Sequence, residues 1–109
     1  MHVIALLLLL AVDDARIYHR VAVAQLARST WTHVEVIGRV TLVRDEADGD
    51  IHFRVADPRG RFVVAEIIPL IPLARPAIGQ RVIVRGIRRW DSRHRWIEVH
   101  PVEALEIQP

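Results

Sequence analysis

The stretch from His33 to Val55, HVEVIGRVTLVRDEADGDIHFRV, decides the fold of this chain. Its apolar residues alternate with polar ones on both sides of Asp48-Gly49, a pattern typical of β-strands with one buried face. They are Val34, Val36, Val40 and Leu42 before the turn, and Ile51, Phe53 and Val55 after it. Asp-Gly favours a tight hairpin, because glycine adopts positive φ without steric cost. Gly38 predicts a bulge or a sharp coil in a long first strand, which is how a small closed barrel begins.

The rest of the chain predicts three further strands. Asp57-Pro58-Arg59-Gly60 has the composition of a β-turn, and a third strand is expected at 61–68. Residues 69–80, PLIPLARPAIGQ, contain three prolines, which exclude a helix and favour a segment packed over a barrel end. The remaining elements are a fourth strand at 81–87, a charged loop at 88–95, a fifth strand at 96–102 and a tail at 103–109.

Five strands in this arrangement predict an all-β fold at residues 31–109 that resembles the five-stranded Greek-key barrel of the OB-fold. We expect the first strand to pair with the second, the second with the third, and the fifth to close against the first. A short helix at 21–28 would plug the barrel, because the proline-rich segment cannot supply one. Another small barrel or a sandwich of similar strand count is the alternative.

Residues 1–30 form a separate N-terminal part, with a continuous apolar run at 3–12, VIALLLLLAV. The run is too short to span a bilayer as a helix. One interpretation is a secretory signal with Ala22-Val23-Ala24 as its cleavage motif, although no basic residue precedes the run. The other is a strand or helix packed on the barrel or on a neighbouring subunit, which would make the chain a self-assembling homo-oligomer. Cytoplasmic and exported locations both stay open.

Composition narrows the chemistry. The 109 residues suffice for one domain with a single core. The absence of cysteine excludes disulfides, thiol catalysis and zinc–thiolate sites. All fifteen basic residues are arginines, which is typical of a GC-rich genome or a hot habitat and also suits phosphate binding. A net charge of +2 is not that of a strongly basic nucleic-acid protein.

The runs DGDIHFRV, VVAEIIP, RVIVRGI and WIEVHPV resemble a group of small uncharacterised bacterial OB-fold-like proteins. Their shared pattern is Asp-Gly-Asp-x-His, then Glu-Ile-Pro, then Glu-(Ile/Leu)-His-Pro-Val, and here Ile68 is inserted before Pro69. The resemblance covers residues 33–107. It implies the barrel fold and no particular activity.

A polar set lies on the strand faces that alternation turns away from the core. Its members are Asp50, His52, Glu66, Glu98 and His100. Two histidines with carboxylates can bind a divalent metal, and Glu98-x-His100 places two ligands on one face of a strand. The preferred interpretation is a structural cluster, in which Asp48 and Asp50 brace their turn and Glu66 pairs with an arginine of the fourth strand.

Single-stranded nucleic acid is the leading predicted ligand, because OB-folds bind it on the second and third strands and the flanking loops. The candidate contacts are Arg39, Arg54, Arg59, Arg61, Arg88, Arg89, Trp90, Arg93 and Trp96. Alternatively the arginines pair with the thirteen acids, Trp96 covers a barrel face, and Phe53 and Phe62 belong to the core. The sequence thus predicts a non-catalytic binding module with no required cofactor. A self-assembling subunit and a metal-dependent hydrolase-like site on the His52/His100 face are the alternatives.

Overall fold

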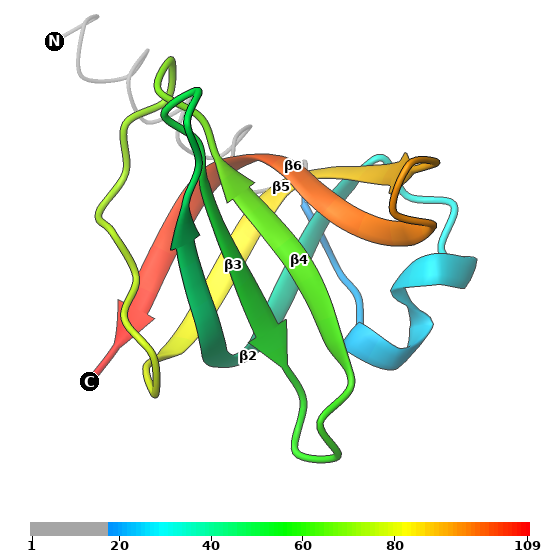
Figure 1. Ribbon diagram of the computed structural model, residues 1–109. Helices are drawn as coiled ribbons and strands as arrows, with labels where there is room; N and C mark the ends of the chain where they lie inside the picture. Colours follow the sequence, from blue (N-terminus) through cyan, green and yellow to red (C-terminus); the bar gives the residue numbers. More distant parts are fainter. Residues whose placement is uncertain (1–17) are drawn as a thin grey trace, which may run out of the picture.

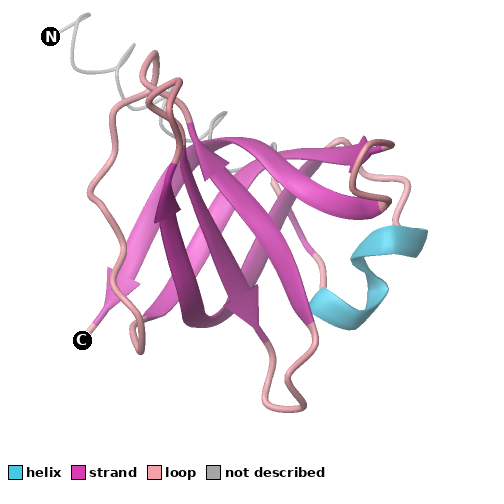
Figure 2. Cartoon of the chain, viewed as in Figure 1, coloured by secondary structure: helices cyan, strands magenta, loops and turns pink. Residues whose placement is uncertain are grey.

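The computed structural model describes residues 18–109, which form an all-β closed barrel of five strands with one additional short strand (Figures 1 and 2). The elements are β1 (His19–Arg20), the 3₁₀ helix η1 (Val23–Arg28), β2 (His33–Asp45), β3 (Ile51–Ala56), β4 (Phe62–Ile67), β5 (Arg81–Asp91) and β6 (Trp96–Gln108). Residues 3–12 lie outside the described part, so export and self-assembly through them stay predictions. Within residues 18–109, no helix is long and apolar enough to cross a membrane.

The barrel closes differently from the expectation. Strand order is β1-β2-β3-β4-β6-β5, and β5 also pairs with β2. The last strand, β6, therefore lies between β4 and β5 and runs parallel to β4. The expected pairing of this strand with the predicted first strand, which is β2, is wrong. The connection at 68–80 runs along the barrel (Figure 1) and brings β5 to the free edge of β2. The hairpin partner of β5, β6, then fills the gap beside β4.

Gly38 lets the single strand β2 pair with two other strands. Residues 33–39 of β2 pair with β5, and residues 39–45 pair with β3. A Cβ atom at Gly38 would lie 2.5 Å from the carbonyl oxygen of Ala56, so only glycine allows this close approach. A register shift follows between Val40 and Leu42. The bulge predicted at Gly38 is therefore displaced along the strand to the step between Val40 and Leu42.

The core is apolar and continuous, and η1 caps it. Phe53, Val55 and Val99 are fully buried inside the barrel. The predicted helix at 21–28 is present as a single 3₁₀ element, whose Leu26 is fully buried in the same cluster. Ser29 ends it with a backbone N–H to the Leu26 carbonyl. Arg88 donates from Nε to the Leu26 oxygen at 2.7 Å, which ties this end of η1 to β5.

The last two strands are longer than the sequence suggested. β5 continues to Asp91 and β6 to Gln108, so the expected charged loop shrinks to residues 92–95 and the expected tail is strand. The tail pairs with the first half of β5, and its Leu105 and Ile107 pack on the core. Segment 68–80 contains no helix, as predicted from its prolines.

Candidate metal centre

A histidine, a glutamate and a second histidine lie in a row across three strands. His52 on β3 and Glu66 on β4 are register partners. The parallel register of β4 and β6 pairs Ala65 with Val99, which brings Glu66 beside His100. One carboxylate oxygen of Glu66 meets Nε2 of His52, and the other lies 2.5 Å from Nδ1 of His100. Strand closure thus builds a cluster from residues up to 48 positions apart (52 to 100 in the numbering).

Glu98 adds a buried carboxylate to this row. Only 2 % of the residue is exposed, although strand alternation turns it away from the core. Its Oε2 accepts a hydrogen bond of 3.0 Å from the indole of Trp96. Burial raises the pKa of Glu98 and outweighs that hydrogen bond, and the nearby carboxylates of Glu66 and Asp91 raise it further.

The β5–β6 turn contributes two groups that the sequence analysis did not select. Asp91 Oδ2 lies 2.7 Å from His94 Nδ1, and its Oδ1 accepts the backbone N–H groups of Arg93 and His94. The hydrogen bond to the His94 side chain is the largest cause, and the one from the His94 backbone N–H the next, of a lowered Asp91 pKa of about 2. The His94 ring stacks on Trp96 at 4.7 Å between centroids. The spacing Asp-x-x-His across a four-residue turn was the available signal.

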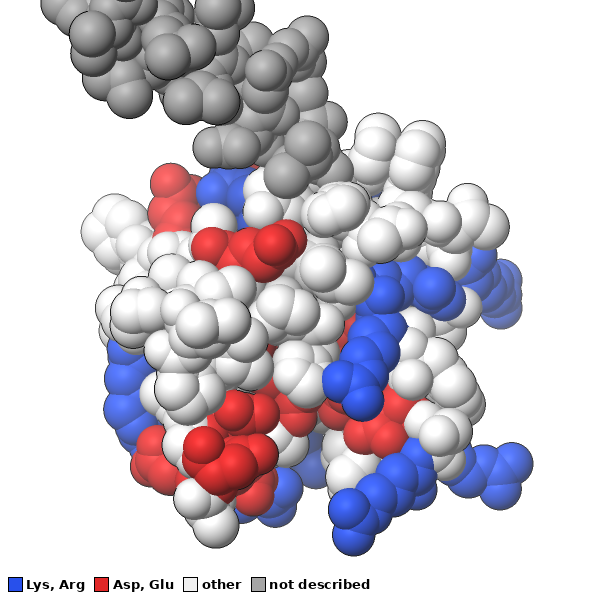
Figure 3. Space-filling model, turned by 90° about the horizontal axis from the view of Figure 1, so that it is seen from above, with Lys and Arg blue, Asp and Glu red and all other residues white. Residues whose placement is uncertain are grey.

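These groups line one groove over β4, between the β2–β3 hairpin and the β5–β6 hairpin, with a volume of about 730 Å³. Its carboxylates belong to Glu46, Asp48, Asp50, Glu66, Asp91 and Glu98, and its guanidinium groups to Arg44, Arg89 and Arg93. Figure 3 shows acidic and arginine side chains side by side on this end of the molecule. We call it the histidine–carboxylate groove.

Metal-ligand atoms converge in the groove in three overlapping groups, with the atoms of each group within 4.8 Å of one another. The groups are Asp50, His52 and Glu66; Glu66, Glu98 and His100; and Asp91, His94 and Glu98. Each of the five predicted ligand residues therefore belongs to one of two groups that share Glu66. The expected pairing of Glu66 with an arginine is wrong, since its described partners are the two histidines. Of the two residues expected to brace the turn, Asp48 does so, because its Oδ1 accepts the backbone N–H of Asp50 at 3.0 Å, whereas the Asp50 carboxylate groups with His52 and Glu66.

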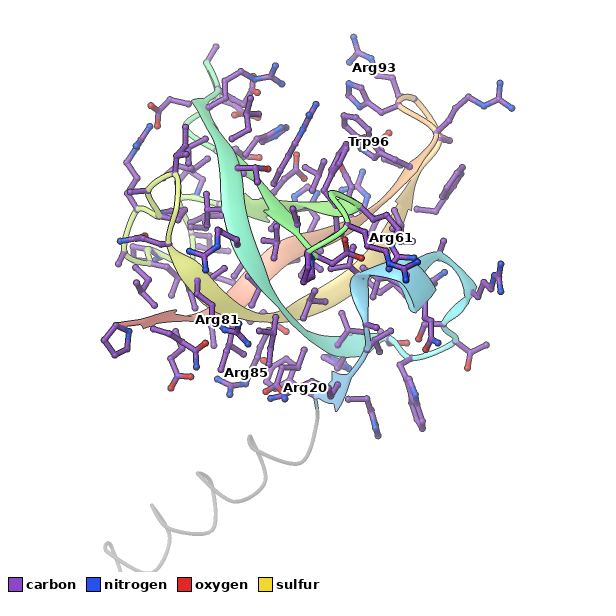
Figure 4. All side chains as sticks on the ribbon, turned by 90° about the horizontal axis from the view of Figure 1, so that it is seen from below. Arg20, Arg61, Arg81, Arg85, Arg93 and Trp96 are labelled. Carbon is purple, nitrogen blue, oxygen red and sulfur yellow. The ribbon has the colours of Figure 1, made fainter. Side chains whose placement is uncertain are left out.

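Seven of the nine predicted nucleic-acid residues fall into two sets, and Arg54 and Arg59 belong to neither. Arg39, Arg61 and Arg88 are engaged within the fold, by the Gly79 carbonyl, by Asp57, and by the Leu26 and Ala27 carbonyls. Arg89, Trp90 and Arg93 line the groove, with Trp96 beside it. In Figure 4, Arg93 and Trp96 lie on one side of the view, and Arg20, Arg81 and Arg85 lie on the opposite side. Arg59 is exposed at the β3–β4 turn, on the chain segment that Asp57 organises.

Two aromatic predictions have different outcomes. Phe53 is fully buried, as expected. Phe62 is 40 % exposed and is not a core residue, because it begins β4 on the outer face. The guanidinium of Arg54 lies over its ring at 4.3 Å, in a cation–π contact on the same outer side.

No protein-family model matches this chain, and no curated protein matches it in sequence. Its class therefore follows from its own structure: a closed five-stranded β-barrel with a histidine–carboxylate groove over β4.

Proposed function

We propose that the histidine–carboxylate groove binds a divalent metal ion. The observation that carries the proposal is the convergence of Glu66, Glu98 and His100, whose ligand atoms lie within 4.8 Å of one another. Asp50 and His52 extend the set through Glu66. Buried carboxylates beside imidazoles from separate strands are an arrangement that a metal ion stabilises.

The donor set favours a first-row transition ion such as Zn²⁺ or Mn²⁺. Imidazole nitrogens with carboxylate oxygens suit these ions, whereas Mg²⁺ and Ca²⁺ prefer oxygen alone. The charge of the lining favours cations in general, because six carboxylates and three guanidinium groups give it a formal charge of −3 with neutral histidines. Such a lining attracts cations.

A metal in an open groove retains positions for water. An ion held by Glu66, Glu98 and His100 would supply a water of lowered pKa for the hydrolysis of an ester or amide. The groove would therefore support hydrolysis, with water as the co-substrate.

The test is calorimetric titration of Zn²⁺ into chelator-treated protein. We expect a Kd in the micromolar range or tighter for the wild type, weakened by about tenfold or more in His52→Ala and His100→Ala. His33→Ala is the matched control, since His33 lies on β2 outside the groove. Absence of binding, or equal binding by all four proteins, would overturn the proposal.

Single-stranded nucleic acid remains the second candidate. In OB-folds such ligands lie over the second and third strands, between the first hairpin and the last. The histidine–carboxylate groove is the corresponding place in this chain. Its lining charge of −3 opposes a polyanion, so the contacts would come from half-exposed Trp90 and exposed Arg93 on its rim. These residues offer stacking and phosphate contacts. The support is an analogy between folds.

Anisotropy of a labelled oligothymidylate tests this second candidate. Affinity should fall steeply between about 50 and 200 mM salt, and about tenfold in Trp90→Ala and Arg93→Met. Arg39→Met is the control, because its guanidinium is held by the Gly79 carbonyl at 2.6 Å. No binding at low salt, or the same loss in the control, would contradict it.

A further inference from the structure

We infer that the histidine–carboxylate groove holds two divalent ions bridged by the carboxylate of Glu66, and that this ion pair takes a phosphate group. The inference rests on the proposed metal site and deepens it. It assigns the number of ions and the chemical class of the ligand.

The geometry of Glu66 is that of a bridge. Its two oxygens do not share a partner: one meets His52 on β3, and the other meets His100 on β6. β4 lies between these two strands, so the histidines approach the carboxylate from opposite sides. A carboxylate with one oxygen on each of two ions holds them about 3.5–4 Å apart, the spacing of two-metal sites.

Each side of Glu66 has its own ligands. Asp50 and His52 group with it on the β3 side, and Glu98 and His100 group with it on the β6 side. Glu66 is the one member common to the two groups. Each ion would therefore have three protein ligands, which leaves positions for water and for a ligand that spans the pair.

Burial supports the bridging role of Glu66. The residue is 5 % exposed, and Glu98 beside it is 2 % exposed. Two buried carboxylates in one cluster repel each other when both are ionised. Two cations would compensate both charges. None of the printed contacts of the groove's guanidinium groups is to Glu66 or Glu98: Arg44 donates to Glu46, Arg89 contacts His100, and Arg93 is exposed.

The charge of the groove selects the ligand. One dication changes the formal lining charge from −3 to −1, and two change it to +1. Only the two-ion form therefore attracts an anion. Phosphate has oxygens to place on both ions and on the arginine N–H groups, which favours it over a single carboxylate.

Equilibrium dialysis and electron paramagnetic resonance with Mn²⁺ test the ion pair. We expect two ions per chain with an exchange-coupled spectrum. His52→Ala should retain one ion with an uncoupled six-line signal, and Glu66→Gln should lose the coupling. Glu106→Gln, an exposed position of the same strand as His100, should behave like the wild type.

The outcomes separate the two proposals. No bound Mn²⁺ or Zn²⁺ overturns both the metal site and the pair. One ion per chain overturns the pair and leaves the metal site standing. Two uncoupled ions in the wild type overturn the Glu66 bridge. The number of ions bound by the wild type and their coupling test the ion pair even where a variant does not fold.

Calorimetry with inorganic phosphate tests the ligand class. The Mn²⁺-loaded chain should bind phosphate, the metal-free chain should not, and Arg89→Met should weaken binding about tenfold. Arg81→Met is the control, because Arg81 lies at the far end of β5 and donates to Gln108. Phosphate binding without metal, or none with it, would overturn the assignment.

Discussion

Glu66 and His100 lie on adjacent parallel strands, and the Oε2 atom of Glu66 is 2.5 Å from the Nδ1 atom of His100. This contact exists because β6 lies beside β4 rather than beside β2. The same Nδ1 atom lies 2.7 Å from a guanidinium nitrogen of Arg89. His100 is therefore shared between the anionic row of the groove and its cationic rim.

Metal should stabilise the folded chain. A ligand at about 100 times its Kd adds about 2.7 kcal/mol, because it binds the folded state and not the unfolded one. We expect Zn²⁺ to raise the Tm of the wild type and of His33→Ala, and not that of the His52→Ala/His100→Ala double variant. Thermal unfolding followed by circular dichroism, with and without Zn²⁺, measures the Tm of each protein. An equal rise in the double variant would mean that the ion binds elsewhere.

Gly86→Ala should destabilise the barrel by about 3 kcal/mol, because overpacking forces the backbone to move. A Cβ there would clash with the Pro101 carbonyl oxygen and lie 2.8 Å from Val99 Cγ1. Gly60→Ala is the control: its φ is +81°, with nothing within 4 Å of the added atom, and the expected cost is about 1 kcal/mol. Urea unfolding compares them. Equal costs would contradict the close packing of β5 on β6.

Arg88→Met should cost about 1.5–3 kcal/mol, the range for hydrogen bonds to charged groups. Arg88 donates to the Leu26 and Ala27 carbonyls at 2.7 and 2.8 Å and fastens η1 to the barrel. Arg59→Met, at an exposed turn, should change stability by less than about 0.5 kcal/mol. Chemical unfolding measures both. A neutral Arg88→Met would show that η1 holds its place without this contact.

Glu35 should stabilise the fold at neutral pH and not in acid. Burial opposes ionisation of Glu35, but hydrogen bonds from Arg85 and Arg20 outweigh it and lower the pKa. A lowered folded-state pKa gives stability that is fully present above the unfolded-state pKa of 4.5 and is lost as the pH falls through the folded-state pKa. Glu35→Gln should therefore cost about 1 kcal/mol at neutral pH, and little in strong acid. Urea unfolding at both pH values, with Glu106→Gln unchanged as the control, tests it.

Local patterns predicted most of the fold. The Asp48-Gly49 turn, the alternating strands and the helix-breaking prolines each depend on neighbouring residues, and each is found where expected. Residues 103–109 were expected to form a short tail, with Leu105 and Ile107 still able to pack. Residues 103–108 form strand because the first half of β5 supplies hydrogen-bonding partners.

The candidate site depends on contacts between distant residues, which local patterns do not define. Alternation correctly grouped His52, Glu98 and His100 on outward faces, and it named all five ligand candidates. Their convergence follows from the β4–β6 register, which no single strand encodes. Alternation turned Glu98 away from the core but did not define its burial: the residue is 2 % exposed, and its carboxylate accepts a hydrogen bond from Trp96.

The parallel seam between β4 and β6 divides the ligands between two halves of the chain. Asp50, His52 and Glu66 precede the 68–80 connection, and Asp91, His94, Glu98 and His100 follow it. Neither half holds both histidines of the row, so neither could have carried the complete centre as an independent ancestral fragment. The centre is a product of barrel closure, and substitutions that loosen the seam should abolish it without touching a ligand.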